Sequence, residues 1–520
     1  MNKILVILLF CFYSAVQGQQ QLLPMEWWLN LRYQAELNKI DNPALTSFKP
    51  YLQSDTGLHT TEKFFKDTTI FYYDFTHKLF ADHLINIKDE DSKIHVDPLL
   101  IYYGGKDFRD TSRYLHSQNS RGFIVRGDLG DKISFSTSFL ETQAYFPNYI
   151  DTFAFERRVI PGMIRWKEFI PKTGKYGYDY GVAAGWINVK PTDWLQIQFG
   201  HDKNFVGDGY RSLLLSDNAF NYPFLRTSYT FMNGKLRYTS VYAWMQTLER
   251  MPAKTTPEAL FIQKGGTFHY LQLMLGKRIE FGLFEGTTFK RFQLPEGTTP
   301  PTIGQYFPLM GFNTLKEGFD AENNVLVGFN LSIKITDGIR AYGQLALDDP
   351  TTNRLGYQAG IQLAEPLNIK GLFLTAEYNT VNPFTYSHEN KRYAYTHNNQ
   401  ELAHPLGASF NEWAITCMYE TRRMRFTNRT VLATKGIWDN KGQGANPTIN
   451  ENRNVDGKEK MLHQLSFVNP EINLKLNVKT NASIFTGVLA RYYDNNSFTD
   501  ETFYFYLGIR TSLYNQYLDF

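Results

Sequence analysis

Apolar and polar residues alternate one by one along several stretches of this chain. In Asn324–Ile335 the odd positions are apolar, whereas the even positions include Ser332 and Lys334. In Phe503–Arg510 the odd positions are again apolar, and the even ones hold tyrosines, a glycine and an arginine. Successive side chains of a strand point to opposite faces, so each stretch predicts a β-strand with one apolar face. A soluble β-sandwich shows the same pattern, and periodicity alone leaves that alternative open.

The connections between the predicted strands distinguish the two architectures, because short and long connections alternate strictly. Outer-membrane barrels have short periplasmic turns and long extracellular loops, whereas a sandwich has no reason to sort its loops in this way. Short turn signals fall at Gly130–Asp131, Lys190–Asp193, Asn233–Gly234, Thr336–Gly338 and Glu365–Asn368. Long polar connections lie near 142–175, 201–222, 249–266, 291–323, 380–409 and 434–461. We therefore predict an all-β outer-membrane β-barrel.

The length of this region sets the number of strands. About 425 residues follow position 95. Each strand, together with half of each flanking connection, takes roughly 24 residues, which gives about 18 antiparallel strands. We expect residues 96–520 to form the barrel and 19–95 to form a small N-terminal periplasmic element and the first strands. Trp27 to Tyr33 are expected to begin an amphipathic helix in that element, with a disordered lead-in as the alternative. At the other end, the last eighteen residues resemble the final strand of an outer-membrane barrel, ending in the aromatic Phe520.

Residues 1–18 have the features of a signal peptide. Lys3 supplies a positive charge, an apolar run follows from Ile4 to Tyr13, and Val16 and Gly18 form a small-residue cleavage pair. After this segment no stretch approaches the ~20 apolar residues that a membrane-spanning helix needs. The mature chain is therefore expected in the outer membrane of a Gram-negative cell.

Composition agrees with a membrane barrel. Aromatic residues make up 16% of the chain, yet the mean hydropathy is −0.38, as expected for alternating strands joined by polar loops. The formal net charge of +3 is too small to indicate nucleic-acid binding. Only Cys417 would remain after removal of the signal peptide, which excludes an intrachain disulfide and a four-cysteine zinc site.

Three polar segments contain more charged and hydrogen-bonding side chains than the formation of strands requires. The first is Gly200–Arg226, with the run GHDKNFVGDGYRSLLLSDN followed by NYPFLR, and the second is Tyr342–Asp349 (YGQLALDD). The third is Tyr395–Gly407 (YTHNNQELAHPLG), preceded by Glu377–Asn379 and Tyr386–His388. In this order they resemble the Wzi-type capsule-assembly family of outer-membrane proteins, including the branch found in gliding bacteria. The resemblance runs from about residue 95 onwards.

The resemblance implies a fold and a role. The fold is a barrel of about 18 strands, and the best-understood role in the family is lectin-like, holding capsular polysaccharide at the cell surface without catalysis. Members of the gliding branch are connected instead with motility and surface proteins.

The predicted topology brings the three segments to one side of the membrane. The strands 194–200, 339–347 and 370–379 each leave a short turn and run outward, so all three deliver their segments to the extracellular side. We therefore expect a site there, and assign polysaccharide binding to Asp202, Lys203, Asp208, Arg211, Arg226, Asp348, Asp349, His397, Asn399, Gln400 and His404.

The residue types suit a glycan. Asp, Asn, Gln and His present hydrogen-bonding groups to sugar hydroxyls, tyrosines offer ring faces, and the basic residues suit uronic-acid carboxylates. The alternative is a structural network in the lumen, since a large barrel needs filling and buried charges need partners.

Enzyme and metal functions are disfavoured. Asp348 and Asp349 are adjacent in a strand and point to opposite faces, so they cannot easily flank one bond. His388, His397 and His404 share one loop, but their spacing matches no usual metal motif. The glycines of 200–209 do not match a phosphate-binding loop. We expect no enzyme activity, cofactor or metal.

The sequence thus predicts an outer-membrane barrel that binds or anchors capsular or other surface polysaccharide, with membrane lipid around it. The first alternative is a barrel subunit of a gliding or protein-secretion assembly, whose loops bind proteins. The second is a diffusion porin, which the crowded loop motifs argue against.

Overall fold

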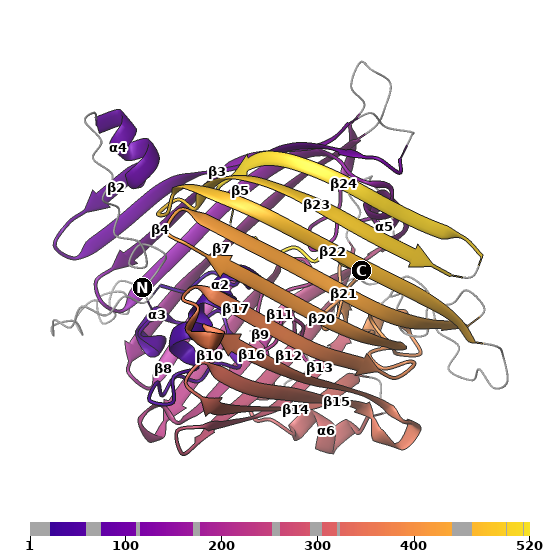
Figure 1. Cartoon of the computed structure of the whole chain (residues 1–520). Coiled ribbons are helices and arrows are strands. Elements are labelled where there is room, and N and C mark those ends of the chain that lie inside the picture. Colours follow the sequence, from indigo (N-terminus) through magenta and orange to yellow (C-terminus); the bar gives the residue numbers. More distant parts are fainter. Residues whose placement is uncertain are drawn as a thin grey trace.

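The chain folds into a closed antiparallel β-barrel (Figure 1). The structure is a computed structural model that describes residues 21–58, 74–110, 115–169, 177–251, 261–291, 304–319, 323–438, 460–495, 497–512 and 514–520, so the expected signal peptide lies outside the described residues. Eighteen strands of the described chain form the barrel, as predicted. They are β3 (Ser92–Asp107), β4 (His116–Leu129), β5 (Ile133–Tyr145), β7 (Gly177–Thr192), β8 (Leu195–Asp202), β10 (Tyr222–Phe231), β11 (Leu236–Arg250), β12 (Phe261–Leu275), β13 (Ile279–Lys290), β14 (Asn324–Thr336), β15 (Ile339–Asp349), β16 (Arg354–Ala364), β17 (Leu372–Val381), β20 (Phe410–Glu420), β21 (Met424–Trp438), β22 (Lys460–Asn477), β23 (Ala482–Asp494) and β24 (Thr499–Arg510).

The barrel closes between its first and last strands. β24 pairs with β3, with Tyr504 opposite Asp107 and Arg510 opposite Ile101. The five predicted short turns join consecutive strands at one end of the barrel, together with three more at 276–278, 421–423 and 478–481. The other connections lie at the opposite end, and they include the short ones 350–353 and 495–498, so the predicted strict alternation of short and long connections fails at these two places. We call the two ends the short-turn end and the long-loop end.

The outer face of the barrel is apolar. Along β24 the outward residues are about half exposed, whereas Tyr504 and Tyr506 between them are buried in the lumen. In β14 the predicted apolar face is outward from Val327 to Ile335, with Leu331 43% exposed, and Val325 is the exception because it is fully buried. Half-exposed apolar side chains on every second position are what a lipid-facing surface requires. The lumen is therefore the polar side. The exposed side chains of β24 are Phe503, Phe505, Leu507 and Ile509.

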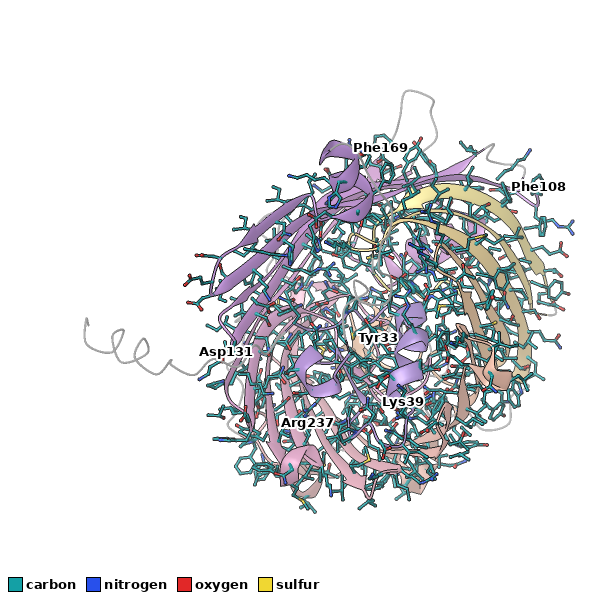
Figure 2. The ribbon with its side chains drawn as sticks, turned by 60° about the vertical axis from the view of Figure 1, so that its left-hand side comes forward. Tyr33, Lys39, Phe108, Asp131, Phe169 and Arg237 are labelled. Atoms are coloured by element: carbon teal, nitrogen blue, oxygen red, sulfur yellow. The ribbon has the colours of Figure 1, made fainter. Side chains whose placement is uncertain are left out.

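The N-terminal segment lies inside the ring of strands rather than beside it. Helix α2 (Trp27–Leu37) contains the predicted helical residues, and Figure 2 shows it with Tyr33 within the lumen at the short-turn end. Its Arg32 Nε donates to Glu420 of β20 at 2.6 Å, and the guanidinium of Arg425 lies 3.4 Å from the centre of the Trp28 ring. Because the helix lies inside the lumen, it is buried on nearly all sides. The barrel wall around it is polar, so polar as well as apolar side chains of the helix are buried.

Two further short elements follow α2 in the lumen. The strand β1 (Phe48–Lys49) and the helix α3 (Gln53–Thr56) continue the N-terminal segment, and β1 forms a two-stranded sheet with β9 (Phe205–Val206). Outside the lumen, α4 (Asp74–Ala81) precedes β2 (Ile85–Lys88), which pairs antiparallel with the first residues of β3 at the short-turn end. Among the described helices, none is long and apolar enough to cross a membrane.

The residues after β24 also enter the lumen. The last strand ends at Arg510, so the expectation that the final strand reaches the aromatic at 520 is wrong. Instead, the Phe520 ring lies 4.7 Å from Phe153 and 5.9 Å from Tyr149, which belong to α5 (Asn148–Arg157). Polar residues of 511–519 find partners in the lumen that a lipid-facing strand end would not offer. We call residues 511–520 the tail.

Candidate functional site

The first polar segment folds into the lumen immediately after β8. Its two residues Phe205 and Val206 pair with β1, which fixes the segment across the barrel interior. Gly207 follows with φ 137°, and a Cβ there would come within 2.5 Å of Gln344 Nε2. Only glycine fits this conformation and this close approach. The segment is therefore shaped for packing inside the barrel.

Arg211 connects the segment to the barrel wall and to the tail. Its Nη2 donates to Glu412 Oε1 at 2.9 Å, and its Nη1 donates to Asp519 Oδ1 at 3.1 Å, with all three side chains 0% exposed. The backbone N–H groups of Tyr210 and Arg211 both donate to Glu377 of β17, each at 2.9 Å. Arg211 thus neutralises part of the charge of Glu412 and Asp519, whereas Glu377 is held by uncharged N–H and O–H donors, including the Tyr342 hydroxyl.

Asp208 and Arg226 are also engaged inside the barrel. Asp208 Oδ1 accepts from Arg340 Nη1 at 3.0 Å and from Thr46 Oγ1 at 2.7 Å. Arg226 Nη1 donates to Asn204 at 3.1 Å, and its guanidinium lies 5.3 Å from the Phe48 ring centre. Both side chains are buried and hold the N-terminal segment against the wall.

Asp202 and Lys203 are half-buried and line an internal cavity of about 140 Å³ beside β3, β4, β5 and β7. Lys203 Nζ donates to the carbonyls of Gly162 and Asp217, each at 2.9 Å. The lysine therefore ties two loop segments together, while the cavity beside it has space for water.

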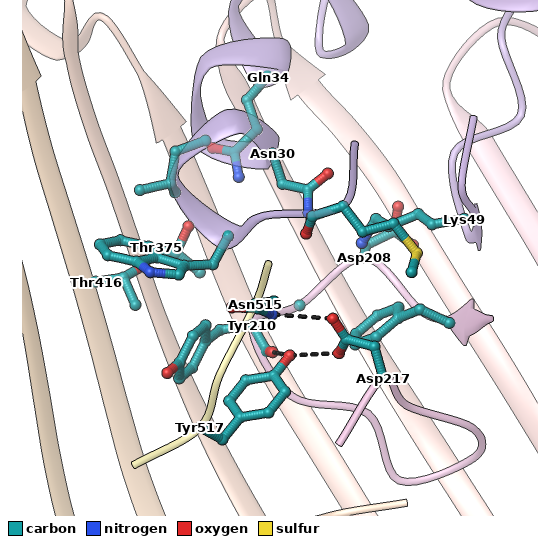
Figure 3. Close-up of a pocket in the computed structure, with 15 residues that line it drawn as sticks. Asn30, Gln34, Lys49, Asp208, Tyr210, Asp217, Thr375, Thr416, Asn515 and Tyr517 are labelled. Carbon is teal, nitrogen blue, oxygen red and sulfur yellow. Dashed lines mark hydrogen bonds between the residues drawn. The ribbon is translucent and has the colours of Figure 1, made fainter. Parts of the chain in front are cut away.

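A second cavity lies at the centre of the plugged lumen (Figure 3). It measures about 30 Å³, which is the space of one or two water molecules. Asp217 borders it and accepts from Tyr517 at 2.7 Å and from Asn515 at 3.0 Å, both in the tail. Figure 3 shows α2, the first polar segment and the tail meeting around it.

The third polar segment forms a small hairpin, β18 (Thr396–His397) and β19 (Gln400–Glu401). Gln400 is buried, and it accepts from Gly162 N–H at 2.6 Å and donates to the Met163 carbonyl at 2.9 Å. Asn399 is half-buried and donates to the Arg157 carbonyl at 3.0 Å. The hairpin is thus fixed against the loop that follows α5.

Two histidines of this segment are buried in their neutral form. His397 Nδ1 accepts from the Gln246 N–H at 3.2 Å, while Nε2 donates to the Asn221 carbonyl at 3.1 Å. Burial lowers the pKa of His397 to about 3. His404 Nε2 donates to Glu412 at 2.7 Å, and burial lowers the pKa of His404 as well. In the described residues no group of three or more His, Cys, Asp or Glu side chains is arranged to hold a metal ion.

The two aspartates of the second segment serve local structure. Asp348 Oδ2 accepts from the Tyr386 N–H at 3.0 Å. Asp349 accepts from Thr351 N–H at 2.9 Å and from Arg354 Nη2 at 2.8 Å, which caps the turn between β15 and β16. The two carboxylates therefore have separate partners.

The predicted convergence of the three segments is present, but it occurs within the barrel. Arg211 of the first segment and His404 of the third both contact Glu412, and Tyr386 beside the third contacts Asp348 of the second. A barrel of eighteen strands encloses a wide lumen, and these loops fill it. A structural network in the lumen, which was the alternative to a glycan site, therefore accounts for most of these contacts.

An open groove remains at the long-loop end, above the filled lumen. It comprises two adjoining hollows of about 250 and 440 Å³ that share Glu249, Lys391 and Arg392. Arg392 Nε donates to Glu249 at 2.9 Å, which fixes the 391–393 turn against the end of β11. Thr247, Leu248, Thr396 and Asn399 complete the first hollow.

Of the groove residues, only Asn399 was predicted from sequence. Glu249, Lys391 and Arg392 lie in the predicted long connections 249–266 and 380–409. Their position in long loops was the available signal, but nothing in the sequence indicated that the two loops meet.

These features define the class of the protein: it has the fold of an outer-membrane β-barrel. No family model matches the sequence, and no curated protein matches it. Among solved structures the chain is similar to Wzi of Escherichia coli, described as a carbohydrate-binding β-barrel involved in group 1 capsule assembly. The TM-score is 0.55 at 13% identity, covering 95% of this chain and 99% of Wzi.

Two other solved barrels are less similar. OpdL of Pseudomonas aeruginosa matches with a TM-score of 0.42 at 10% identity, covering 81% of this chain and 98% of OpdL. OccAB2 of Acinetobacter baumannii matches with a TM-score of 0.42 at 11% identity, covering 80% of this chain and 96% of OccAB2. At such identities the similarity to Wzi establishes the fold.

Proposed function

We propose that this protein is a non-catalytic outer-membrane barrel that holds surface polysaccharide at its long-loop end, which faces the outside of the cell. The groove formed by Glu249, Lys391, Arg392 and Asn399 carries the proposal, because it is an open hollow with hydrogen-bonding groups fixed on two loops. Its larger part, about 440 Å³, lies within the ~300–1,000 Å³ usual for ligand sites. The similarity of fold to Wzi supports the same function.

The residues that the sequence predicted for the site fall into two groups. Asn399 is proposed to contact glycan directly, beside Lys391 and Arg392. The other predicted residues are proposed to act indirectly: their buried contacts hold the loops that shape the groove. Sugar hydroxyls suit such a site, since fixed amide, carboxylate and guanidinium groups each offer several hydrogen bonds.

The filled lumen argues against a diffusion porin. Helix α2, the first polar segment and the tail meet at the barrel centre around a cavity of about 30 Å³. A barrel that conducts solutes needs a water-filled channel. We expect liposomes containing the protein to show little conductance, and a porin-sized conductance would contradict this part of the proposal.

The test combines a groove variant with a matched control. In Lys391→Ala/Arg392→Ala, glycan retention should fall about tenfold or more, because charge-assisted hydrogen bonds are lost. Lys277→Ala, an exposed lysine at the short-turn end, is the control. Folding is followed by heat-modifiable gel mobility, and cell-bound against released polysaccharide gives the function. Normal retention with lost motility or secretion would favour the assembly-subunit alternative instead.

A further inference from the structure

Three neighbouring strands carry polar side chains on the outer face of the barrel. Arg237 of β11, Gln272 of β12 and Glu280 of β13 point into the lumen, where each contacts the N-terminal segment. Successive side chains of a strand alternate between its faces, so the intervening residues of these strands point outward. Polar side chains occur among the outward residues of all three strands. We call the following five the polar row: Tyr238, Ser240, Thr267, His269 and Glu285.

The polar row is covered by another part of the chain. Ser240, Thr267 and His269 are at most 1% exposed, and Glu285 is 2% exposed. The cover is the 304–319 segment, which belongs to the connection between β13 and β14 that was predicted as a long extracellular loop. It contains the helix α6 (Phe312–Glu317), which Figure 1 shows outside the ring of strands beside β14. This connection therefore folds back onto the outer face of the wall.

The polar row binds the backbone of the 304–319 segment. Tyr238 Oη donates to the Pro308 carbonyl at 2.7 Å. Glu285 accepts from the N–H groups of Gly311 at 2.7 Å and of Thr314 at 3.0 Å, at the start of α6. Backbone groups within a bilayer need such partners, because hydrocarbon offers none. The row thus supplies what an irregular segment needs in order to lie in lipid.

The same contacts give the depth of the segment. Its connection begins after Lys290 and ends before Asn324, both at the long-loop end. Tyr238, however, is the third of the 15 residues of β11, counted from the short-turn end. About 9–11 residues of a strand cross a bilayer. A segment that starts at one end of the wall and reaches Tyr238 therefore lies within the thickness of the membrane.

The surface that the segment turns away from the wall is apolar. Leu315 is 90% exposed and Leu309 is 61% exposed. They continue the apolar outer face of β14, on which Leu331 is 43% exposed. Lys316 is also exposed, and its stem is long enough to carry the charge towards the headgroups.

We propose that the 304–319 segment is part of the lipid-facing surface of the protein, with Leu309 and Leu315 in contact with acyl chains of the bilayer. This inference goes beyond the proposed function and does not depend on it. It explains together why polar and ionisable side chains lie on the outer face of the wall and why the segment that covers them exposes leucines. Such side chains are costly in lipid unless they are paired with other groups of the protein, and the segment provides that pairing.

The experiment uses the full-length protein in vesicles of phosphatidylcholine that carries a photoreactive diazirine at the end of one acyl chain. After illumination, labelled peptides are identified by mass spectrometry. We expect the label in 304–319 to be comparable with that in 327–335 of β14, and several-fold above that in the 391–393 turn at the long-loop end. Label in 327–335 with none in 304–319 would overturn the inference. Lysine cross-links through Lys316 between two copies, without lipid label in 304–319, would assign the surface to a second copy and overturn it as well.

Glu285→Leu tests the part played by the polar row. The change removes both acceptors for the start of α6, while the new side chain suits a lipid-facing position. We expect the lipid label of 304–319 to fall several-fold and that of 327–335 to stay unchanged, because a segment with unpaired backbone groups leaves the hydrocarbon.

The control for this variant is Glu501→Leu, which removes an exposed carboxylate on β24 and should leave both labels unchanged. Folding is followed by heat-modifiable gel mobility. Unchanged label of 304–319 in folded Glu285→Leu would overturn the role of the row in holding the segment. Loss of the folded band in Glu285→Leu would also overturn that role, since the residue would then support the wall itself, and the labelling of the wild type would still decide whether the segment lies in lipid.

Discussion

Replacing Arg211 by methionine tests whether the buried network holds the lumen contents. The change removes the hydrogen bonds to Glu412 at 2.9 Å and to Asp519 at 3.1 Å, and leaves two carboxylates buried without their cation. Breaking a buried ion pair by removing one partner costs about 3–5 kcal/mol. This lowers the folding equilibrium constant by a factor between about one hundred and several thousand.

The measurement is the urea midpoint of the folded band in a heat-modifiability gel, with the protein in lipid vesicles. Arg109→Met provides the comparison, because Arg109 is 62% exposed and its pair with Glu501 is worth only about 0–1 kcal/mol. Adding Glu412→Gln to Arg211→Met should recover part of the loss, since it removes one of the unpaired charges. If Arg211→Met and Arg109→Met had the same midpoint as the wild type, the network would not stabilise the barrel.

Acid should open the 396–401 hairpin, because the pKa of His397 is about 3 in the folded chain and ~6.5 in the unfolded chain. At acidic pH the unfolded chain binds more protons than the folded one. The free energy of opening the hairpin is therefore highest above pH 6.5 and is about 2 kcal/mol lower at pH 5. Hydrogen exchange of the hairpin amides at pH 7.5 and at pH 5 measures this opening free energy, and the difference between the two pH values should be smaller in His397→Gln. Equal pH dependence in the variant and the wild type would show that His397 is not the group responsible. On β5, Phe139→Lys places a charge on the lipid face and should cost ~2–4 kcal/mol, whereas Ser136→Lys points into the 140 Å³ cavity and should assemble. Equal amounts of folded protein in the membrane for the two variants would show that the inside and outside faces are wrongly assigned.

The barrel wall was predictable because its signals are local. Alternation along a strand such as Phe503–Arg510 needs only the residues of that strand, and each short turn is encoded by its own few residues. Five of the eight short turns of the described chain follow from these signals, whereas the number of strands followed from the length of the region.

The contents of the lumen were not predictable in the same way. The sequence around Arg211 does not reveal whether its side chain binds a ligand or pairs with Asp519. That depends on where the tail lies in the fold, because Asp519 is 308 residues away along the chain. The three polar segments do come together, but they meet inside the lumen, where most of their side chains are buried and paired with other groups of the protein. The Glu249–Arg392 pair was missed for the same reason, since it joins two loops that are distant in sequence.

The pairing of β1 with β9 has a consequence for the order of folding. Lys49 and Gly207 are 158 residues apart, and Arg211 and Asp519 are 308 residues apart, so each contact closes a long loop of chain. Closing such loops costs entropy before any stabilising contact forms, which makes these the slow steps. We therefore expect the N-terminal segment, although it is made first, to pair with β9 only after the surrounding wall strands have formed. Closure of the lumen is thus a late event, and protection of the Phe205 and Val206 amides in pulsed hydrogen exchange should appear after that of the wall strands.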